Sequence, residues 1–417
     1  MDIRPRCFDK VLQLIKKGVE IPNPLMVDVG DDVRIEHISS EGVILYPGCR
    51  IYGSETVISS DCRLGYEAPV TIENCRLAEK VELRGGYFNK SVFLKQAQMG
   101  SGAQVREGCI LEEQANGAHC VGIKQTILFP FVTLGSLINF CDCLMAGGRS
   151  RKDHSEVGSS YIHFNFTPDG DKTTPSLLGD VPRGVMLNQP PIFLGGQGGI
   201  IGPVRIGYGN VIAANSVLRS DYIEDGKLVI GKAGNGGTLA FKPRTYRGIR
   251  RVLENNIIYL SNLLALEAWY NHVRKPFFDS QEFGRHIFSG LIDTIALAKS
   301  ERIHRLKILA EKAGASDESS KISDHASAGR KQLREKFSEV EALFATEMES
   351  ELSRNSRETF LNRLEKTGDF TGRDYITCIQ TLPSDVALKG TEWLQSLIDA
   401  YCEKTKAILP LLNVFCK

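Results

Sequence analysis

The sequence of 417 residues lacks long apolar runs and lacks an excess of charge of one sign. The best candidate for an apolar run, residues 257–266, is interrupted by Ser261 and Asn262, so we expect no membrane-spanning helix. The 51 Lys and Arg residues and 50 Asp and Glu residues leave a formal net charge of +1. This balance argues against a nucleic-acid partner, which would require a basic surface.

Disulfide and zinc-site spacings are also missing, although the chain has 11 cysteines. The N-terminal residues have the pattern of an amphipathic, charged helix rather than a cleavable signal peptide. Both features predict a protein of the reducing cytoplasm. Cys120, Cys141, Cys143 and His119 lie close in the sequence, but without paired C-x₂₋₄-C spacing we predict no metal site and interpret the cysteines as small core residues.

Glycine is abundant, with 40 residues, most of them before residue 240. A turn-rich β domain followed by a helical domain would produce this skew. The length allows two or three domains, and a hydrophobic content of 42 % is enough for sizeable cores.

The most informative stretch is residues 201–220, IGPVRIGYGNVIAANSVLRS. Its aliphatic residues Ile201, Ile206, Ile212 and Leu218 recur at intervals of about six, and a small residue follows most of them. Neither an α-helix nor an alternating strand has this period. It is typical of a parallel β-helix, in which each short strand ends at a corner and points its aliphatic side chain into a prism-shaped core.

The same period organises the first half of the chain. The hexads MGSGAQ, VREGCI and LEEQAN are in phase, whereas residues 85–98 depart from the phase and are predicted to bulge or loop. After residue 241 the apolar residues have helical spacing. The predicted domains are a capping helix (residues 1–24), a β-helix (25–240) with a loop excursion at about 145–200, and an α-helical domain (241–417) with long helices near 282–312, 328–353 and 384–412.

The segment GPVRIGYGNVIAAN resembles the last coils of the β-helix in bacterial bifunctional N-acetylglucosamine-1-phosphate uridyltransferase/glucosamine-1-phosphate acetyltransferase. NFTPDGDK at residues 165–172 is similar to the NYDG segment of that family, and the first coils resemble UDP-N-acetylglucosamine pyrophosphorylase-like proteins. The resemblance covers about residues 17–235. It implies a left-handed hexapeptide-repeat β-helix, acetyl-CoA as co-substrate, and a homotrimer with sites between the prisms.

The sequence departs from this family in two respects. It has no Gly-rich phosphate loop with a following Lys on an α/β domain, which argues against self-contained nucleotide-sugar synthesis. The Asn-His pair that supplies the catalytic base in the family corresponds here to Asn139 and Phe140. The usual base is therefore missing or has moved.

Two histidines of the excursion, His154 and His163, are the candidate general bases, because the pKa of His lies near the working pH. The alternative interpretation is that each of them is a surface or hydrogen-bonded histidine of a loop without a catalytic role. The resemblance places a substrate-holding amide at Asn165 beside Phe166, although a tight turn at Asp169-Gly170 explains this segment equally well.

The resemblance also implies a coenzyme A groove. Gly196 and Ala214 match positions that line this groove, and small corner residues are expected there in any case. Lys232 matches a basic residue near the coenzyme phosphates, with an exposed lysine as the alternative. A cationic cluster at the junction is suited to phosphate or pyrophosphate, or else forms an interdomain or solvated face; its members are Lys242, Arg244, Arg247, Arg250 and Arg251.

Two functions stay open on the sequence alone. The first is a hexapeptide-repeat transferase that acts on a sugar phosphate or nucleotide sugar, with acetyl-CoA-dependent acyl transfer as the reaction. The second is a non-catalytic protein that binds a sugar nucleotide or organises partners, related to UDP-N-acetylglucosamine pyrophosphorylase and lacking its nucleotidyltransferase domain. The NFTPDG and IAAN segments favour the first function, and the missing Asn-His pair favours the second.

Overall fold

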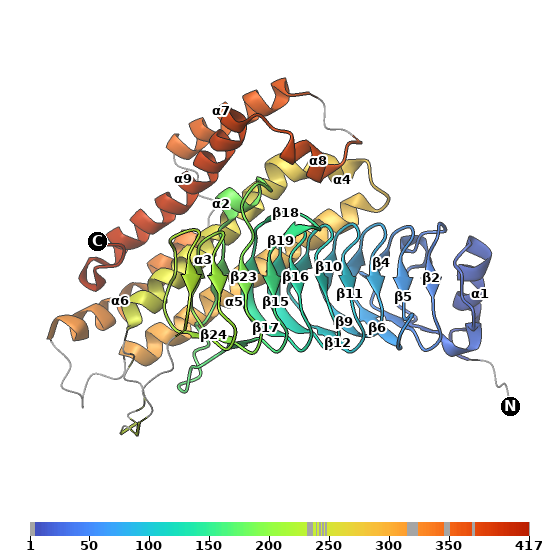
Figure 1. Ribbon diagram of the computed structural model, residues 1–417, viewed down its shortest axis with the longest axis horizontal. Coiled ribbons are helices and arrows are strands. Elements are labelled where there is room, and N and C mark those ends of the chain that lie inside the picture. Colours follow the sequence, from blue (N-terminus) through green and yellow to red (C-terminus); the bar gives the residue numbers. More distant parts are fainter. Residues whose placement is uncertain are drawn as a thin grey trace.

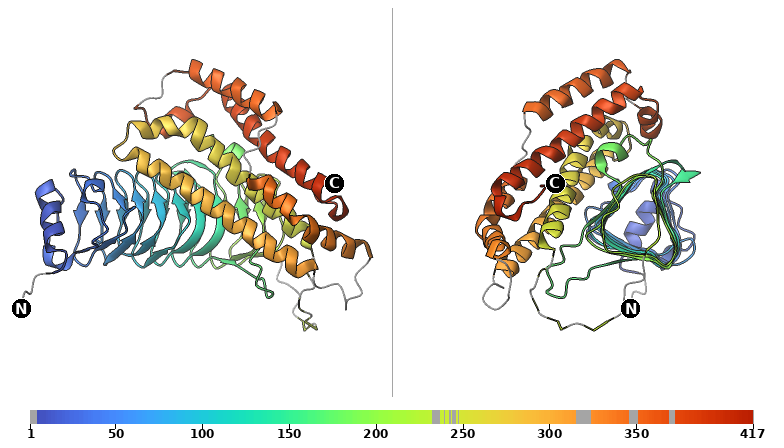
Figure 2. Two further views of the ribbon diagram at one scale, coloured as in Figure 1. Left: turned by 180° about the vertical axis from the view of Figure 1, so that it is seen from behind. Right: turned by 60° about the vertical axis from the view of Figure 1, so that its left-hand side comes forward.

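The computed structural model describes residues 5–231, 237–238, 240–241, 243, 246, 248–314, 324–345, 351–368 and 372–416. Its main feature is a parallel β-solenoid of about 11 turns, followed by a C-terminal helical region, which confirms the predicted fold class. The solenoid has a three-sided cross-section, and the long helices lie along one side of it (Figures 1 and 2).

Face A of the prism is a ten-stranded parallel sheet. Its strands are β2 (Ile44–Leu45), β5 (Arg63–Leu64), β8 (Glu82–Leu83), β11 (Gln98–Met99), β14 (Asn116–Gly117), β16 (Thr133–Leu134), β20 (Glu156–Val157), β23 (Phe193–Leu194), β26 (Val211–Ile212) and β28 (Leu228–Val229).

Faces B and C belong to one 16-stranded sheet that folds around a corner, because β15 (Gly122–Leu128) and β17 (Asn139–Met145) run across both. Face B also contains β1 (Asp28–Val29), β3 (Arg50–Tyr52), β6 (Val70–Glu73), β9 (Gly86–Asn89), β12 (Ala103–Val105), β21 (Ile162–Phe164), β24 (Gly199–Ile201) and β27 (Val217–Leu218). Face C also contains β4 (Val57–Ile58), β7 (Arg76–Leu77), β10 (Ser91–Phe93), β13 (Cys109–Leu111), β22 (Ser176–Leu178) and β25 (Arg205–Ile206).

Each strand is short because the chain turns at a corner after every few residues, and in-register stacking lets one inward side chain per strand fill the core. On face B this inward row includes Ile51, Ile72, Phe88, Val105 and Ile123, all of them buried. A parallel row of small residues follows the corner between faces B and C. Cys109 pairs there with Ser91, and Cys143 with Thr126 and Ser176.

The prediction of a bulge or loop at residues 85–98 is wrong. This stretch forms β9, β10 and β11, which pair in register with the coils on either side. The inward positions are occupied by Phe88 and Phe93 rather than by aliphatic residues. Aromatic side chains at these positions hide the hexad pattern without interrupting the coil.

The first coil is covered by α1 (Phe8–Lys17), which buries Val11 and Leu14 and ends at Gly18 in the left-handed conformation (φ 118°). Two short 3₁₀ turns follow, η1 (Pro24–Met26) and η2 (Ile35–His37). A terminal coil exposes unpaired backbone groups and apolar side chains, so a helix at this end protects the solenoid from edge-to-edge pairing.

The stretch predicted as a loop excursion contains strands β20 to β23 of the solenoid and three insertions, one before β20 and two between β21 and β23. The first insertion is a hairpin of β18 (Gly148–Ser150) and β19 (Asp153–His154), the second is a loop at residues 165–175, and the third begins with α2 (Val181–Gly184). Each insertion leaves the prism at a corner.

The helical region consists of α3 (Ile249–Trp269), the π-helical turn η3 (Tyr270–Arg274), α4 (Lys275–Asp279), α5 (Gly284–Gly314), α6 (Asp324–Ala345), α7 (Glu351–Lys366), α8 (Tyr375–Gln380), α9 (Ser384–Ile408) and η4 (Pro410–Leu412). Within the described ranges, no helix combines the length and apolar character needed to cross a membrane.

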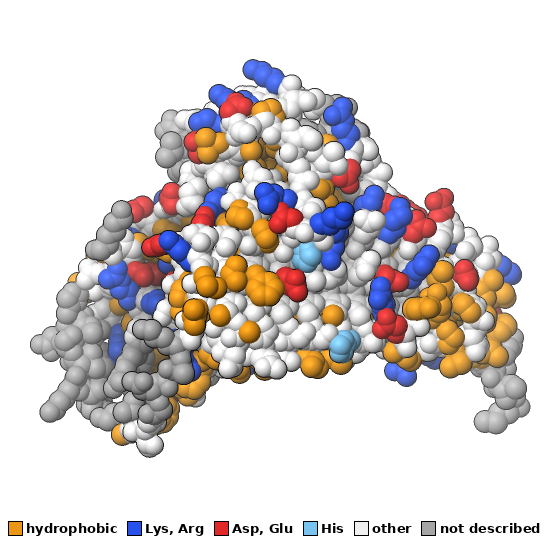
Figure 3. Space-filling view, viewed as in Figure 1, with side chains coloured by type: hydrophobic (Ala, Val, Ile, Leu, Met, Phe, Trp, Pro, Cys, Tyr) orange, Lys and Arg blue, Asp and Glu red, His pale blue; other side chains and the backbone are white. Residues whose placement is uncertain are grey.

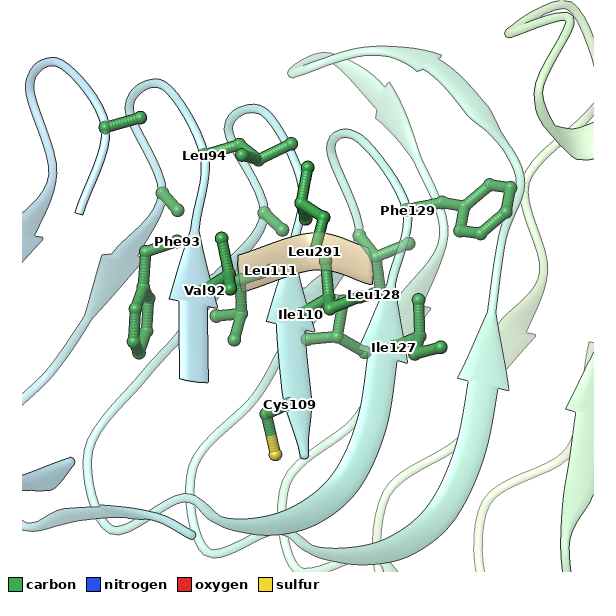
Figure 4. Close-up of a cluster of buried hydrophobic side chains, with 14 of the residues drawn as sticks. Val92, Phe93, Leu94, Cys109, Ile110, Leu111, Ile127, Leu128, Phe129 and Leu291 are labelled. Carbon is green, nitrogen blue, oxygen red and sulfur yellow. The ribbon is translucent and has the colours of Figure 1, made fainter. Parts of the chain in front are cut away.

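Helices α3 and α5 cover face C. Its outward side chains Val92, Ile110 and Ile127 are buried, and Leu291 of α5 lies against them (Figure 4). Buried ion pairs add to this apolar contact. Arg302 of α5 binds Asp142 at 2.8 Å, and Arg274 of η3 binds Glu112 at 3.2 Å.

Candidate functional site

A large cavity lies where the solenoid meets the helical region, at the corner between faces B and C. We call it the junction cavity. Its volume is about 840 Å³, within the range of small-molecule sites. The loop at residues 165–175 forms one wall, and the start of α3 with Leu309 of α5 forms the other; the lining includes Phe166, Pro168, Asp171, Thr174, Ile201, Pro203, Phe241, Tyr246, Ile249, Arg251 and Val252.

The loop is closed by its own side chains. The hydroxyl of Thr174 donates to Oδ1 of Asn165 at 2.5 Å, which joins the two ends of the loop. Asp171 is buried, and its Oδ1 accepts hydrogen bonds from the backbone N–H and the hydroxyl of Thr173 at 3.1 and 2.5 Å. Such local side-chain bonds fix a turn that has no sheet partner.

Helices α3 and α5 hold the same loop from outside. Asn256 donates its amide to the carbonyl of Thr173 at 3.1 Å, and Arg302 donates to the carbonyl of Lys172 at 3.2 Å. The ammonium of Lys312 donates to the carbonyl of Asp169. The position of the loop therefore depends on the helical region as well as on the solenoid.

Of the predicted cationic cluster, Arg251 lies at the junction cavity. Its guanidinium donates to the carbonyl of Pro203 at 2.7 Å and lies 3.6 Å from Asp221. Arg250 instead pairs with Glu254 at 2.9 Å and donates to the carbonyl of Cys416, so it points toward the C-terminus. The other residues predicted to bind phosphates lie outside the described residues; they are Lys232, Lys242, Arg244 and Arg247.

His163 lies inside the prism. It occupies an inward position of face B, in register with Ile200, and its Nε2 lies 2.8 Å from the hydroxyl of Ser176. Burial, together with the nearby Arg302 guanidinium, lowers the pKa of His163 to about 3. Its ring is therefore neutral at pH 7, and it has no access to a substrate in this conformation.

His154 lies on the hairpin at the corner between faces C and A. Its side chain is partly exposed, and its Nε2 is 3.9 Å from Glu156 of β20. The hairpin tip is held by Arg151, which donates to the carbonyl of Phe131 at 2.7 Å and to the hydroxyl of Thr133 at 2.9 Å. Of the two candidate bases, His154 is the one that solvent reaches.

Gly196 and Ala214 lie at the remaining corner, between faces A and B. A side chain at Gly195 would meet the backbone nitrogen of Ala214 at 2.4 Å, and one at Gly196 would meet the carbonyl of Ser159 at 2.8 Å. Close packing of successive coils explains the small residues here.

The candidate residues thus occupy all three corners of one prism. His154 is at the C/A corner, Asn165 and Phe166 are at the B/C corner, and Gly196 and Ala214 are at the A/B corner. Within one chain, the structure brings Phe166 and Arg251 together at the junction cavity and leaves His154 on another corner.

The residues that position the loop were missed from the sequence, and they are Asp171, Asn256, Arg302 and Lys312. One signal was available, because Asn255 and Asn256 interrupt the apolar pattern of α3 and both are buried. A buried amide in a helix needs a hydrogen-bond partner from another element.

The chain is similar to curated proteins named bifunctional protein GlmU. It is 27 % identical to the protein of Thermotoga maritima over 225 residues, which is 54 % of this chain and 44 % of the relative. It is 28 % identical over 221 residues to that of Fervidobacterium nodosum (53 % and 43 %) and 24 % identical over 222 residues to that of Staphylococcus haemolyticus (53 % and 44 %). No protein-family model matches the chain.

The chain spans less than half the length of these relatives. The similarity and the parallel solenoid confirm the resemblance to a hexapeptide-repeat β-helix of the GlmU kind. The helical region lies beyond the part of the chain that such a solenoid accounts for.

Proposed function

We propose that the protein is an acyltransferase that transfers an acetyl group from acetyl-CoA to a sugar phosphate or nucleotide sugar. The observation that supports this is the junction cavity, because one of its walls is the NFTPDGDK segment that resembles the acetyltransferase family. The cavity combines apolar walls with the Arg251 guanidinium, several hydroxyl groups and the carboxylates of Asp169 and Asp171. The carboxylates and hydroxyl groups suit sugar hydroxyls, and the guanidinium suits a phosphate.

In the proposed reaction, a hydroxyl or amino group of the sugar attacks the thioester carbonyl. The new C–O or C–N bond forms as the C–S bond breaks, and the coenzyme A thiolate takes up a proton. A general base accepts the proton of the attacking group. We assign this role to His154, the partly exposed histidine of the two candidates, and a positioning role to the amide of Asn165.

We further propose that the site is completed in a homotrimer. Faces A and B carry exposed apolar side chains over the C-terminal coils, whereas face C is covered by α3 and α5. Figure 3 shows the apolar group on face A, which includes Phe193, Val211 and Leu228; Ile162 and Val217 are exposed on face B. Two free faces let each prism pack against two neighbours in a closed ring, so that the His154 hairpin of one chain meets the loop of the next.

One observation favours the second function, a non-catalytic sugar-nucleotide-binding or scaffold protein. Among the described residues that line the junction cavity there is no histidine. A monomer of this structure would bind a ligand in the cavity without a histidine base beside it.

Subunit mixing distinguishes these functions. Acetyl transfer from acetyl-CoA to glucosamine 1-phosphate and to UDP-linked sugars is measured for the wild type, for His154→Ala and Asn165→Ala, and for the two variants mixed after dissociation and reassociation. We expect each variant to lose about 10²-fold in turnover and the mixture to recover part of the activity. The control is His163→Gln.

Ligand-induced thermal stabilisation without turnover in the wild type would support the non-catalytic function instead. Full activity in His154→Ala would exclude this histidine as the base. Failure of the mixture to recover activity would contradict a site shared between chains.

A further inference from the structure

A second cavity lies between face C of the solenoid and helices α3 and α9, and we call it the α9 cavity. Its volume is about 590 Å³, within the range of small-molecule sites. Both parts of the molecule contribute apolar walls, with Ile206 of β25, Ile258 of α3 and Ile398 of α9 in the lining. None of its described lining residues also lines the junction cavity.

The solenoid wall of the α9 cavity carries the guanidinium of Arg205. Its Nη2 lies 3.4 Å from Oδ2 of Asp221, whereas its Nε is buried and has no hydrogen-bond partner among the described residues. A buried donor without a partner is uncommon and carries a desolvation cost that a bound acceptor would remove. Asp221 also lies 3.6 Å from Nη1 of Arg251. One carboxylate is therefore shared between two guanidinium groups, and these three side chains together carry a surplus positive charge.

The opposite wall belongs to α9 and carries carboxylates. Asp399 and Glu403 lie about one helical turn apart, and both are exposed. Neither has a cation within ion-pair distance in the part of the chain that the structure describes. Arg183, the second cation of the lining, is bound by Asp180 and Asp225 of the solenoid at 2.7 and 2.5 Å. The α9 wall therefore presents two carboxylates that lack a positively charged partner.

The thiol of Cys402 on α9 shows that these charges lie close together. Burial raises the pKa of this thiol to about 12. The charges of Asp399 and Glu403 raise the pKa further, and the charge of Arg205 lowers it. All three charged groups therefore lie near one point of the cavity lining, although no ion pair joins Arg205 to either carboxylate in the described structure.

We propose that the α9 cavity binds an α-amino acid with an apolar side chain. The carboxylate of the ligand accepts a hydrogen bond from the Nε–H of Arg205, and its ammonium donates to Asp399 and Glu403. The apolar side chain contacts the three isoleucines of the lining. The opposite charges of the two walls match the two ends of a zwitterion, whereas an ion of one sign would leave one wall without a partner.

Calorimetric titration of the full chain with L-leucine tests the proposal, and we expect saturable binding. Isocaproate has the same apolar group and the carboxylate but no ammonium, and isoamylamine has the ammonium but no carboxylate. Each analogue should bind at least about tenfold more weakly than L-leucine, because each loses a charge-assisted hydrogen bond. Absence of saturable binding of L-leucine would overturn the proposal, and so would an analogue that binds as tightly as L-leucine.

Variants localise the binding. Arg205→Lys keeps the positive charge but removes the Nε–H donor, and Asp399→Asn/Glu403→Gln removes the two carboxylates; each should weaken L-leucine binding about tenfold or more. The matched control Asp385→Asn/Glu392→Gln removes the same charge from exposed positions of α9 outside the cavity and should bind as the wild type does.

Unchanged affinity in Asp399→Asn/Glu403→Gln, or equal weakening in the control variant, would contradict a site at the α9 cavity. These results do not depend on acyl transfer, because none of the substituted residues lines the junction cavity.

Discussion

His163 shows how the coil register decides the chemistry of a residue. Its neighbours in the inward row of face B are Phe140 and Ile200, so the imidazole is buried in a position that other coils fill with hydrocarbon. The hydroxyl of Ser176 provides its hydrogen bond at 2.8 Å. A neutral imidazole fits this position, and a charged one does not.

Acid should therefore destabilise the protein through His163. Its pKa is near 6.5 in an unfolded chain and about 3 in the fold, so between these values the unfolded chain binds more protons. The stabilisation by the neutral ring is fully present above pH 6.5 and is lost as the pH falls toward 3. In the wild type, the unfolding free energy should fall as the pH is lowered from 6.5 to 4. In His163→Gln we expect this fall to be smaller by up to roughly 3 kcal/mol.

Urea denaturation at a series of pH values measures this effect. His119→Gln, which changes an exposed histidine of the solenoid, serves as the control and should keep the wild-type pH dependence. Parallel pH profiles for the wild type and His163→Gln would contradict the assignment.

A second prediction about a single residue concerns Arg274. It is fully buried, pairs with Glu112 and Glu113, and lies 3.8 Å from the ring centre of Tyr375. Burial raises the pKa of Glu112 to about 7 even with the guanidinium beside it. Arg274→Met leaves two buried carboxylates without their cation, which should cost about 3–5 kcal/mol of unfolding free energy.

Urea or guanidinium denaturation tests the Arg274 prediction. The pair of Arg250, which is exposed, and Glu254, which is partly buried, provides the comparison. Arg250→Gln should change stability by no more than about 0.5 kcal/mol. Similar losses in both variants would show that the buried network adds nothing beyond a surface ion pair.

At the scale of elements, the loop at residues 165–175 is positioned by two helices from a distant part of the sequence. Lys312→Met removes the hydrogen bond from α5 to the carbonyl of Asp169. We expect amide exchange in the loop to become about tenfold faster, because an opening that loses one charge-assisted hydrogen bond is easier by about 1.5 kcal/mol.

Hydrogen exchange read by mass spectrometry provides the measurement. Lys307→Met makes the same chemical change on α5 at a residue that pairs with Glu341 of α6 at 3.6 Å, and it should leave exchange in the loop unchanged. Faster exchange throughout the chain, rather than in the loop, would indicate general destabilisation and would contradict the positioning role.

The sequence predicted the solenoid because one inward residue per strand repeats along the chain, as Ile206, Ile212 and Leu218 do. It did not predict which histidine faces inward, because three insertions shift the register between residues 145 and 200. Nor did it separate α6 from α7. Parts of both were predicted as one helix at 328–353, because both helices are highly polar. The contact of Arg302 with Asp142 joins residues 160 positions apart, which no local pattern reveals.

At the scale of the whole molecule, the exposed apolar side chains on faces A and B predict self-association. Phe193 and Val211 are neighbours in register on face A, with about 40 % of each side chain exposed. Val211→Glu places a charge in the middle of this apolar stripe, and desolvating it in an interface would be costly. We expect the wild type to have three times the 46.1 kDa mass of the chain, and Val211→Glu to be monomeric.

Light scattering coupled to size exclusion measures both masses. Arg63→Glu changes an outward residue of face A in a coil near the N-terminal end of the solenoid and should remain trimeric. A wild-type protein that elutes as a monomer at micromolar concentration would contradict the trimer.

Helix α5 also changes how the molecule unfolds. Its 31 residues extend about 46 Å, the depth of about nine stacked coils. It meets His37 near the first coil through His286, with ring centres 4.3 Å apart, then Arg76 through Asp293 at 3.4 Å and Asp142 through Arg302 at 2.8 Å. In a bare solenoid each coil contacts only its neighbours, so unfolding can start at either end and proceed coil by coil.

Because α5 contacts early and middle coils at once, the loss of one of these coils weakens the contacts of the others. The solenoid and α5 should therefore melt as one cooperative unit, with equal calorimetric and van't Hoff enthalpies. A broad, multistep transition would indicate that the coils remain independent. A helix that lies along a repeat array thus links coils that would otherwise unfold one by one, so that they unfold together in a single transition.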